Sequence, residues 1–409
     1  MRIDRITGAC CVGPARHIDL SLADGVVAAT APAGGSAAPV AGTLAADGRV
    51  VVPAFVDAHV HLDKAYLIGH PSLGDDLSTT LDGAIAAVGR LRKVLTLDDV
   101  RIGALRAVDT LVRNGTTAAR VHVEIDPVTG LGPVTLHQAL AAAVAERCRL
   151  QLVAFPQRGL ELPGAADLLR AAMAEGLAVV GGCPYVDDDP AAHLDVVFAL
   201  AQRHGVPIDL HLDFSDDPGR SLLTLVAERT KATGMHGLVT IGHVTTLAAM
   251  SPSDRARSLA LLAEHDIALV ALPATDLHLA GGGSPGTRSV APVLEAVRAG
   301  LRVAIANNNI ANPFAPFGNG NLVQAAWLAG VVGRAASDED QRLLLDAIST
   351  SPAAILGLPA PGVAVGAVAD LAVLDTTDPG AVIRGAPGVV ATLKAGWLVH
   401  RIEPPLVGP

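Results

Sequence analysis

The sequence predicts a (β/α)8 barrel of the TIM type, with a small β-sandwich-like lobe beside it that both chain termini form. Eight apolar, strand-like runs recur along the middle of the chain, separated by Ala/Leu/Arg-rich segments long enough for one or more helices. Strands that are apolar on both faces and alternate with helices indicate a parallel sheet, and eight of them indicate a closed barrel. No glycine-rich fingerprint follows the first run, which disfavours a doubly wound dinucleotide-binding sheet.

The expected barrel strands are the eight apolar runs at 50–56, 116–123, 150–156, 177–182, 206–212, 238–243, 267–273 and 301–306. Helical segments between them include 98–114, 136–147, 165–175, 191–204, 254–265 and 290–299. Asn114-Gly115 and Glu175-Gly176 supply C-terminal stops for two of these helices.

Both ends of the chain carry a pattern of short strands. Residues 1–50 alternate short apolar runs with Gly and Ala, and the segments 363–374 and 389–399 combine β-type residues with turn glycines. We therefore expect residues 1–50 and 355–409 to pair into the lobe, and residues 51–354 to form the barrel.

Composition excludes several classes of partner. The formal net charge of −10, the absence of a Lys/Arg cluster and an aromatic content of 2% argue against nucleic acid. No apolar run is long enough to span a bilayer, and the first residues lack a secretory signal pattern, so we expect no membrane partner and a cytoplasmic location. Four cysteines without CxxC spacing indicate buried thiols: Cys10, Cys11, Cys148 and Cys183.

Two histidines at the end of the first predicted strand suggest a metal site. Because side chains alternate along a strand, the imidazoles of His59 and His61 project the same way and offer half of a metal-ligand set. Other polar residues end or follow later predicted strands: His122, Gln157, His211, His243, Asp276, His278, Asn307, Asn308 and Asn309. The C-terminal ends of barrel strands are where active sites lie, so this placement favours a metal-containing active site.

Five motifs, taken in order, resemble the amidohydrolase superfamily and, within it, the cytosine-deaminase-like branch. They are VDAHVHLDK at 56–64, AFPQRG at 154–159, DLHLD at 209–213, GHVTT at 242–246 and DLHL at 276–279. The segment GAVADL at 366–371 is similar to the flanking β-lobe of the same family. The resemblance covers nearly the whole chain.

The resemblance implies roles for individual residues. His59, His61 and His211 should hold one divalent metal, zinc or iron, with His243 beside the metal-bound water or the substrate. Gln157 should hydrogen-bond a planar heterocyclic substrate. The metal would lower the pKa of its water, which would then attack an amide-like or amidine-like carbon. No lysine stands where two-metal members carry a bridging one, so we expect one metal at most.

Two positions depart from the family pattern. Asn308 stands where the family has an aspartate, and Phe214 stands where cytosine deaminases have a glutamate. A carboxamide oxygen can coordinate a metal but is too weak a base to take a proton, so the occupancy of the metal site stays open. Deaminating cytosine needs one proton on the ring and another on the leaving ammonia, so the loss of both groups argues against that particular reaction.

Three accounts of these departures remain open. Nearby carboxylates could replace the missing groups, the site could run a non-hydrolytic reaction, or catalysis could be lost. The candidate carboxylates are Asp63, Asp213, Asp216, Asp217 and Asp276. Among them we name Asp213 as a candidate catalytic residue beside His243 and Asn308, while the pair Asp216-Asp217 is equally compatible with a helix N-cap.

The remaining expectations concern substrate binding. The candidate substrate-binding set is Gln157, Lys64, Asp276, His278 and Phe214. Lys64 directly follows the metal motif, which favours a clamp for a substrate anion, and the Pro/Gly-rich segment 312–321 is predicted to line the pocket. His122 is interpreted as an inner-barrel residue that orients a ligand. His122-Val123-Glu124 matches the HxE of another zinc deaminase class only superficially, because no PCxxC follows.

The sequence thus predicts a metal-dependent amidohydrolase that acts on a C–N bond of a small cyclic or N-heterocyclic compound, by deamination or by ring or amide hydrolysis, with atypical proton-transfer groups. The alternatives are a cyclase, lyase or isomerase on the same barrel with a weakened or absent metal, and a catalytically inactive binding protein. We expect a small-molecule substrate and a homo-oligomer.

Overall fold

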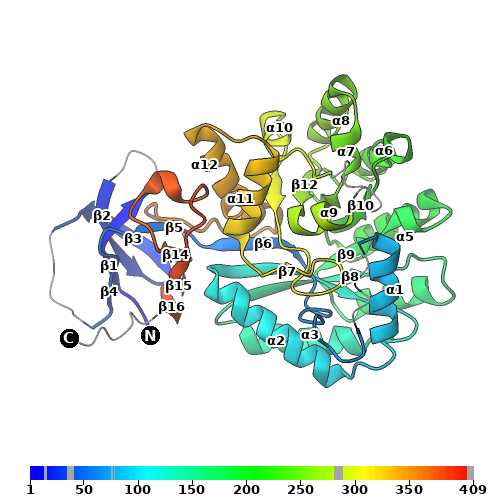
Figure 1. Cartoon of the computed structure of the whole chain (residues 1–409), viewed down its shortest axis with the longest axis horizontal. Helices are drawn as coiled ribbons and strands as arrows, with labels where there is room; N and C mark the ends of the chain where they lie inside the picture. Colours follow the sequence, from blue (N-terminus) through cyan, green and yellow to red (C-terminus); the bar gives the residue numbers. More distant parts are fainter. Residues whose placement is uncertain (13–15, 35–40, 75–76, 78, 281–288, 403–409) are drawn as a thin grey trace.

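Two eight-stranded sheets organise the chain in the computed structural model, which describes residues 1–12, 16–34, 41–74, 77, 79–280 and 289–402 (Figure 1). The lobe built from both ends of the chain lies on one side, and the helix-wrapped barrel lies on the other. Within the described ranges, no helix has the length and apolar character needed to cross a membrane.

The barrel is the second sheet, and its parallel strands neighbour one another in chain order. They are β6 (Phe55–Val60), β7 (Thr116–Glu124), β8 (Arg149–Phe155), β9 (Val179–Gly182), β10 (Ile208–Leu212), β11 (Val239–His243), β12 (Ala268–Ala271) and β13 (Val303–Ile305). The two ends of this sheet meet at Asn308, whose backbone N–H donates to the His59 carbonyl at 2.9 Å and whose carbonyl accepts from His61 N–H at 2.7 Å. The predicted barrel is confirmed, and its seam places Asn308 against the His-x-His segment.

Helices cover the outside of the barrel and connect its strands. They are α1 (Leu81–Leu91), α2 (Leu97–Arg113), α3 (Gly132–Val144), α4 (Ala165–Ala174), α5 (Pro190–His204), α6 (Leu223–Thr233), α7 (Thr246–Ala249), α8 (Pro252–Glu264), α9 (Pro273–Leu279), α10 (Val293–Arg298), α11 (Leu322–Val332), α12 (Asp338–Asp346) and α13 (Thr350–Ile355). The capping box of Thr96 and Asp99 starts α2, and Asn114 caps its C-terminus before Gly115 as predicted. All six predicted helices are present, as α2, α3, α4, α5, α8 and α10. The helices that were not among them are α1, α6, α7, α9, α11, α12 and α13.

The lobe is one continuous sheet to which both chain ends contribute. Its strands are β1 (Arg5–Cys11), β2 (Arg16–Ala23), β3 (Val26–Pro32), β4 (Thr43–Ala45), β5 (Val50–Pro53), β14 (Leu371–Leu374), β15 (Val389–Lys394) and β16 (Trp397–Arg401). Strand β5 lies between β1 and β14, so it joins the N-terminal strands to the C-terminal ones. The predicted pairing of the termini is confirmed.

The first predicted barrel strand needs a correction. The apolar run at 50–56 is divided between the two sheets: β5 ends at Pro53 in the lobe, and β6 begins at Phe55 in the barrel. The sequence shows no break because every residue from Val50 to Val56 except Pro53 is buried, in one core or the other. The barrel strand therefore extends farther than expected, and His59 lies within it rather than after it.

Candidate active site

Three imidazoles converge at the C-terminal end of the barrel. His59 on β6 and His61 just after it each place Nε2 3.1 Å from Nε2 of His211 on β10. Zn–N bonds of about 2.0–2.1 Å with tetrahedral angles hold ligand nitrogens about 3.3 Å apart, so this spacing fits a shared metal. Burial lowers the pKa of all three well below the usual histidine range, which keeps the imidazoles neutral and able to coordinate.

Asn308 adds an oxygen to this set. Its side chain is buried, and within the described residues its Oδ1 atom accepts no hydrogen bond. An unpartnered buried carboxamide oxygen beside three convergent imidazoles is suited to a metal ligand. Asn308 has φ 59, a left-handed conformation that Asn tolerates better than most residues. The donor set fits a divalent metal such as zinc or iron, but it carries no negative charge.

His122 on β7 is an alternative to His61 as the third imidazole ligand. Ring nitrogens of His59, His122 and His211 also lie within 4.8 Å of one another. However, Nε2 of His122 lies 3.1 Å from Asp209 Oδ1, and its ring stacks on that of His59 with centroids 3.7 Å apart. Because the ring nitrogen of His61 lies directly against His211 and that of His122 is held by a carboxylate, we favour His61 as the ligand.

A buried ion pair lies behind His59. Arg120 on β7 is fully buried and donates to Asp209 Oδ2 on β10 at 2.7 Å. The other oxygen of Asp209 lies 3.7 Å from Nδ1 of His59, on the side of the ring away from the convergent nitrogens. At this distance His59 Nδ1 makes no hydrogen bond to Asp209, whose Oδ1 atom lies 3.1 Å from His122 Nε2 instead, so Asp209 acts on His59 as a nearby negative charge.

His243 ends β11 and is paired with a second buried carboxylate. Its Nδ1 atom lies 2.6 Å from Asp276 Oδ1 on α9. Burial raises the pKa of Asp276, and the neighbouring imidazole opposes that rise. The His243 ring lies 5.2 Å from the ring of His211 and 5.2 Å from that of Phe214. Asp276 thus holds the His243 ring in one orientation beside the candidate metal site, an arrangement that suits an imidazole for acid or base chemistry.

A narrow cavity of about 20 Å³ adjoins these groups. Aromatic and aliphatic side chains at its walls include Leu81, Tyr185, Phe214 and Phe314, and polar ones include Lys64, Gln157, Thr275 and Asn309. Such a volume holds about one water, so the walls must move apart to admit a heterocyclic ring. Of the predicted substrate-binding set, Gln157, Lys64 and Phe214 line this cavity, whereas His278 is half-buried on α9 and is not among the lining residues.

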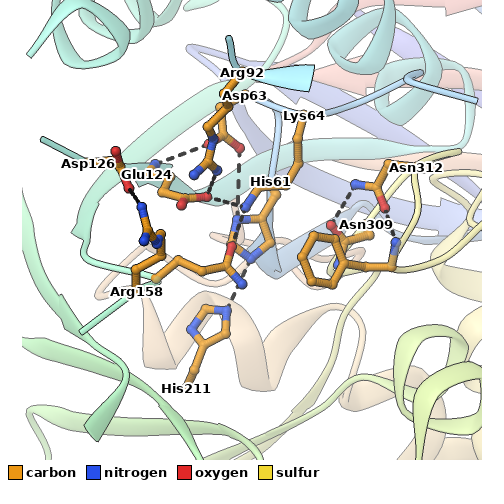
Figure 2. Close-up of polar contacts among 12 residues, drawn as sticks. His61, Asp63, Lys64, Arg92, Glu124, Asp126, Arg158, His211, Asn309 and Asn312 are labelled. Atoms are coloured by element: carbon orange, nitrogen blue, oxygen red, sulfur yellow. Dashed lines mark hydrogen bonds and ion pairs between the residues drawn. The ribbon is translucent and has the colours of Figure 1, made fainter. Parts of the chain in front are cut away.

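Lys64 has protein partners at the cavity wall (Figure 2). It is buried, and its Nζ donates to Glu124 Oε2 at 2.7 Å and to Gln157 Oε1 at 2.6 Å. Arg92 contacts the same oxygen of Glu124. Burial would raise the pKa of Glu124, but the charges of Arg92 and Lys64 outweigh it and lower the pKa. Lys64 thus orients Gln157, and its charge is already paired with a carboxylate.

The other candidate carboxylates have local structural partners. Asp213 accepts from Ser221 Oγ at 2.6 Å, from Leu222 N–H at 2.9 Å and from Thr246 Oγ1 at 3.1 Å, which favours a role in holding the loops after β10 and β11. Asp217 caps the short 3-10 helix at Pro218–Arg220. Asp63 accepts from Glu124 N–H at 3.2 Å.

Sequence reasoning missed the charged residues outside the narrow cavity. Glu124 and Asp126 end or follow β7, and Arg158 follows Gln157, so the strand-end criterion could have found all three. Arg92 caps α1 and Asp209 lies inside β10, so the criterion could find neither. The segment at 312–321 contributes Phe314 to the cavity, as expected.

Comparisons with known proteins identify a family and several relatives of this chain. The model of the amidohydrolase family matches residues 106–400. Pterin deaminase of Rhizobium rhizogenes is 31% identical over 362 residues, which are 86% of this chain and 81% of that protein. N-isopropylammelide isopropyl amidohydrolase of Pseudomonas sp. (strain ADP) is 27% identical over 88% of both chains. The crystal structure of 5-methylcytosine deaminase from Klebsiella pneumoniae with phosphonocytosine superposes with a TM-score of 0.91 at 28% identity, covering 99% of this chain and 100% of that one.

Proposed function

The chain belongs to the amidohydrolase family, and on that premise we propose that it is a metal-dependent hydrolase of a C–N bond in a small N-heterocyclic compound. The observation that carries the proposal is the convergence of His59 Nε2 and His61 Nε2 on His211 Nε2 beside a cavity that contains Gln157. Named relatives act on heterocycles, as pterin and 5-methylcytosine deaminases do. The resemblance to the cytosine-deaminase-like branch is thereby confirmed.

The metal ligands would be His59, His61, His211 and the Asn308 oxygen. A bound divalent metal would supply Lewis-acid activation of water. Gln157 orients the ring: its Oε1 accepts from Lys64, so its N–H group faces acceptors on the substrate. Phe214 and Phe314 pack against the ring and exclude water.

Proton transfer falls to the pair of His243 and Asp276. Asn308 is no base, and Phe214 has no titratable group, so neither serves. Asp213 is occupied by Ser221, Thr246 and the backbone. His243 Nδ1 is held by Asp276 at 2.6 Å, which leaves Nε2 for exchanging a proton with water or with the leaving nitrogen.

A second candidate function is a non-hydrolytic reaction on the same site. The neutral residues Asn308 and Phe214 at the two usual carboxylate positions favour it, because a cyclisation, elimination or isomerisation needs fewer proton transfers through carboxylates. In such a non-hydrolytic reaction Gln157 and His243 would keep the roles given above, and the metal would be less necessary.

The test is metal analysis of purified protein, with product release measured before and after chelation on a panel of aminated pterins, pyrimidines and triazines. We expect about one metal per chain and ammonia or amine release that chelation abolishes and zinc or iron restores. Turnover of a panel compound by metal-free protein would instead favour the non-hydrolytic reaction. A cytoplasmic location and a homo-oligomer remain predictions, the second open to a sedimentation measurement.

A further inference from the structure

A second cavity, of about 300 Å³, adjoins the narrow one and has a different character. Gln157 and Phe314 line both, so these two side chains form the partition between them. A volume of about 300 Å³ is at the lower end of the range for small-molecule sites. A substituent on a ring held in the narrow cavity would pass Gln157 and Phe314 and enter this space, which we call the outer cavity.

The outer cavity carries an excess of positive charge. Its carboxylates are Glu124 and Asp126, and its cationic side chains are Arg92, Lys93 and Arg158, with Arg90 as a fourth that has an interaction of its own. With Arg90 left out of the count, the formal excess is one positive charge. The formal net charge of the whole chain is −10. A positive cavity beside the active site of an acidic protein is the arrangement that attracts an anionic group locally.

The two carboxylates are already matched by cations (Figure 2). Glu124 Oε2 contacts both Lys64 and Arg92, and Asp126 Oδ2 accepts from Arg158 Nη1 at 3.3 Å. A guanidinium has five N–H donors in a planar fork that fits a carboxylate or phosphate in a bidentate manner. Arg92 and Arg158 therefore retain donors for a further anion after pairing with Glu124 and Asp126.

The two guanidiniums differ in burial, so we expect Arg92 to be structural and Arg158 to contact the substituent. The side chain of Arg92 is 15% exposed and held by Glu124, whereas that of Arg158 is 47% exposed. Arg158 directly follows Gln157 after β8, so the residue that meets the ring and the residue that meets the substituent are neighbours in sequence. The apolar side chains of Ile85, Val88 and Val128 complete the walls.

We propose that the outer cavity binds an anionic substituent, a carboxylate or phosphate, on the heterocyclic substrate, with Arg158 as its specificity-determining residue. This inference rests on the proposed function for the ring itself. The alternative is that the outer cavity binds a cationic substituent. Glu124 Oε1 could accept a hydrogen bond from such a group, because it accepts none within the described residues. The structure favours the anion because the cations outnumber the carboxylates in the cavity.

The test measures binding by calorimetry and turnover for pterin, pterin-6-carboxylate and 6-aminomethylpterin, and for cytosine and 5-carboxycytosine. Free phosphate as a competitor separates a phosphate preference from a carboxylate one. We expect the carboxylated compound of at least one pair to bind more tightly than its neutral partner, and Arg158→Gln to reduce that ratio on the order of 10-fold. Arg158→Lys should restore part of the ratio, and higher ionic strength should weaken it.

Arg170→Gln is the matched control, since Arg170 is 49% exposed and paired with Asp167 on α4. It should leave the ratio at the wild-type value. Three results would overturn the inference: equal binding within each pair, tighter binding of the aminomethyl compound, or a ratio that Arg158→Gln does not change. Hydrolysis of the neutral compounds would still support the proposed function in each case. Arg158-dependent binding without any turnover would support the anion site and reject the proposed hydrolysis. If no compound bound at all, both would be rejected.

Discussion

His243 Nδ1 lies 2.6 Å from Asp276 Oδ1, and this contact joins the end of β11 to α9 at the mouth of the barrel. Both side chains are buried, and His243 is also one of the residues that line the narrow cavity. With a carboxamide at 308 and a phenyl ring at 214, this pair is the one to which we assign proton transfer in the proposed reaction.

Asp276→Asn should lower kcat on the order of 10²-fold, because the amide cannot stabilise the protonated imidazole. KM should change far less, and bound metal should stay near one per chain. The matched control is Asp187→Asn, which alters a second buried pair, His193 Nδ1 to Asp187 Oδ2 at 2.7 Å. Steady-state kinetics with unfolding curves for both variants check this. A similar loss of kcat in the control would show that the effect is structural.

Asn308→Asp should raise metal affinity by about 10-fold or more, because a carboxylate adds a negative charge to a neutral ligand set. Competition with a chromogenic chelator measures this without any substrate. Asn309→Asp adds the same charge one residue along, where the side chain contacts Thr275 and Asn312. An equal gain in both variants would mean that general electrostatics, and not coordination by residue 308, sets the affinity.

Asp209→Asn should lower metal affinity by about 10-fold, since the His59 ring loses a negative charge 3.7 Å from its Nδ1 atom and the stacked His122 ring loses its carboxylate partner. The visible spectrum of the cobalt-substituted protein should change as well if the His59 ring reorients. Thr240→Val is the comparison, because it removes a 3.2 Å bond from Arg120 and leaves the bond of Arg120 to Asp209. Unchanged affinity and spectrum in Asp209→Asn would remove Asp209 from the metal site.

Glu124→Gln should destabilise the protein by about 3 kcal/mol near pH 7, because it leaves Lys64 and Arg92 buried without their carboxylate. The folded-state pKa of Glu124 is lowered from 4.5, so its contribution is present above pH 4.5 and is lost as pH falls through the folded pKa. The difference between wild type and variant in urea unfolding should shrink with acid. Glu295→Gln, at an exposed pair with Arg255, should cost less than about 1 kcal/mol at any pH. If the difference in unfolding free energy between wild type and Glu124→Gln grew in acid, the pairing of Glu124 with Lys64 and Arg92 would be contradicted.

All four cysteines are buried and free, as the sequence predicts, and should resist thiol reagents in the native protein. Burial raises the pKa of Cys11 to about 11 and that of Cys148 and Cys183 to about 12. At pH 8 the reactive thiolate is therefore scarce. A disulfide exchange reagent should titrate four thiols in denaturant and react only slowly before unfolding. Rapid native reaction of any thiol would show an exposed site that the fold does not have.

The barrel could be predicted because each of its strands is buried on both faces and reads as an apolar run that alternates with a helix. The predicted start of the first strand was wrong, since the run from Val50 to Val56 is apolar across the boundary between two cores. Helix α1 escaped prediction, although Thr80 caps it and it carries Arg92 to the site. Its two glycines, Gly83 and Gly89, weaken the helical signal of this 11-residue segment.

The sequence by itself determined which histidines end the strands and in what order, because strand ends and period-2 alternation are local properties of the chain. Only the tertiary structure decided the partners of the site residues: Asp276 for His243, Asp209 for His122, and Glu124 for both Lys64 and Arg92. Those pairings depend on the register between strands and on where α1 packs across the barrel mouth. Burial then sets the charges, keeping the three imidazoles neutral and the carboxylate of Glu124 ionised. The local pattern located the site, and long-range packing supplied its acid–base and electrostatic character.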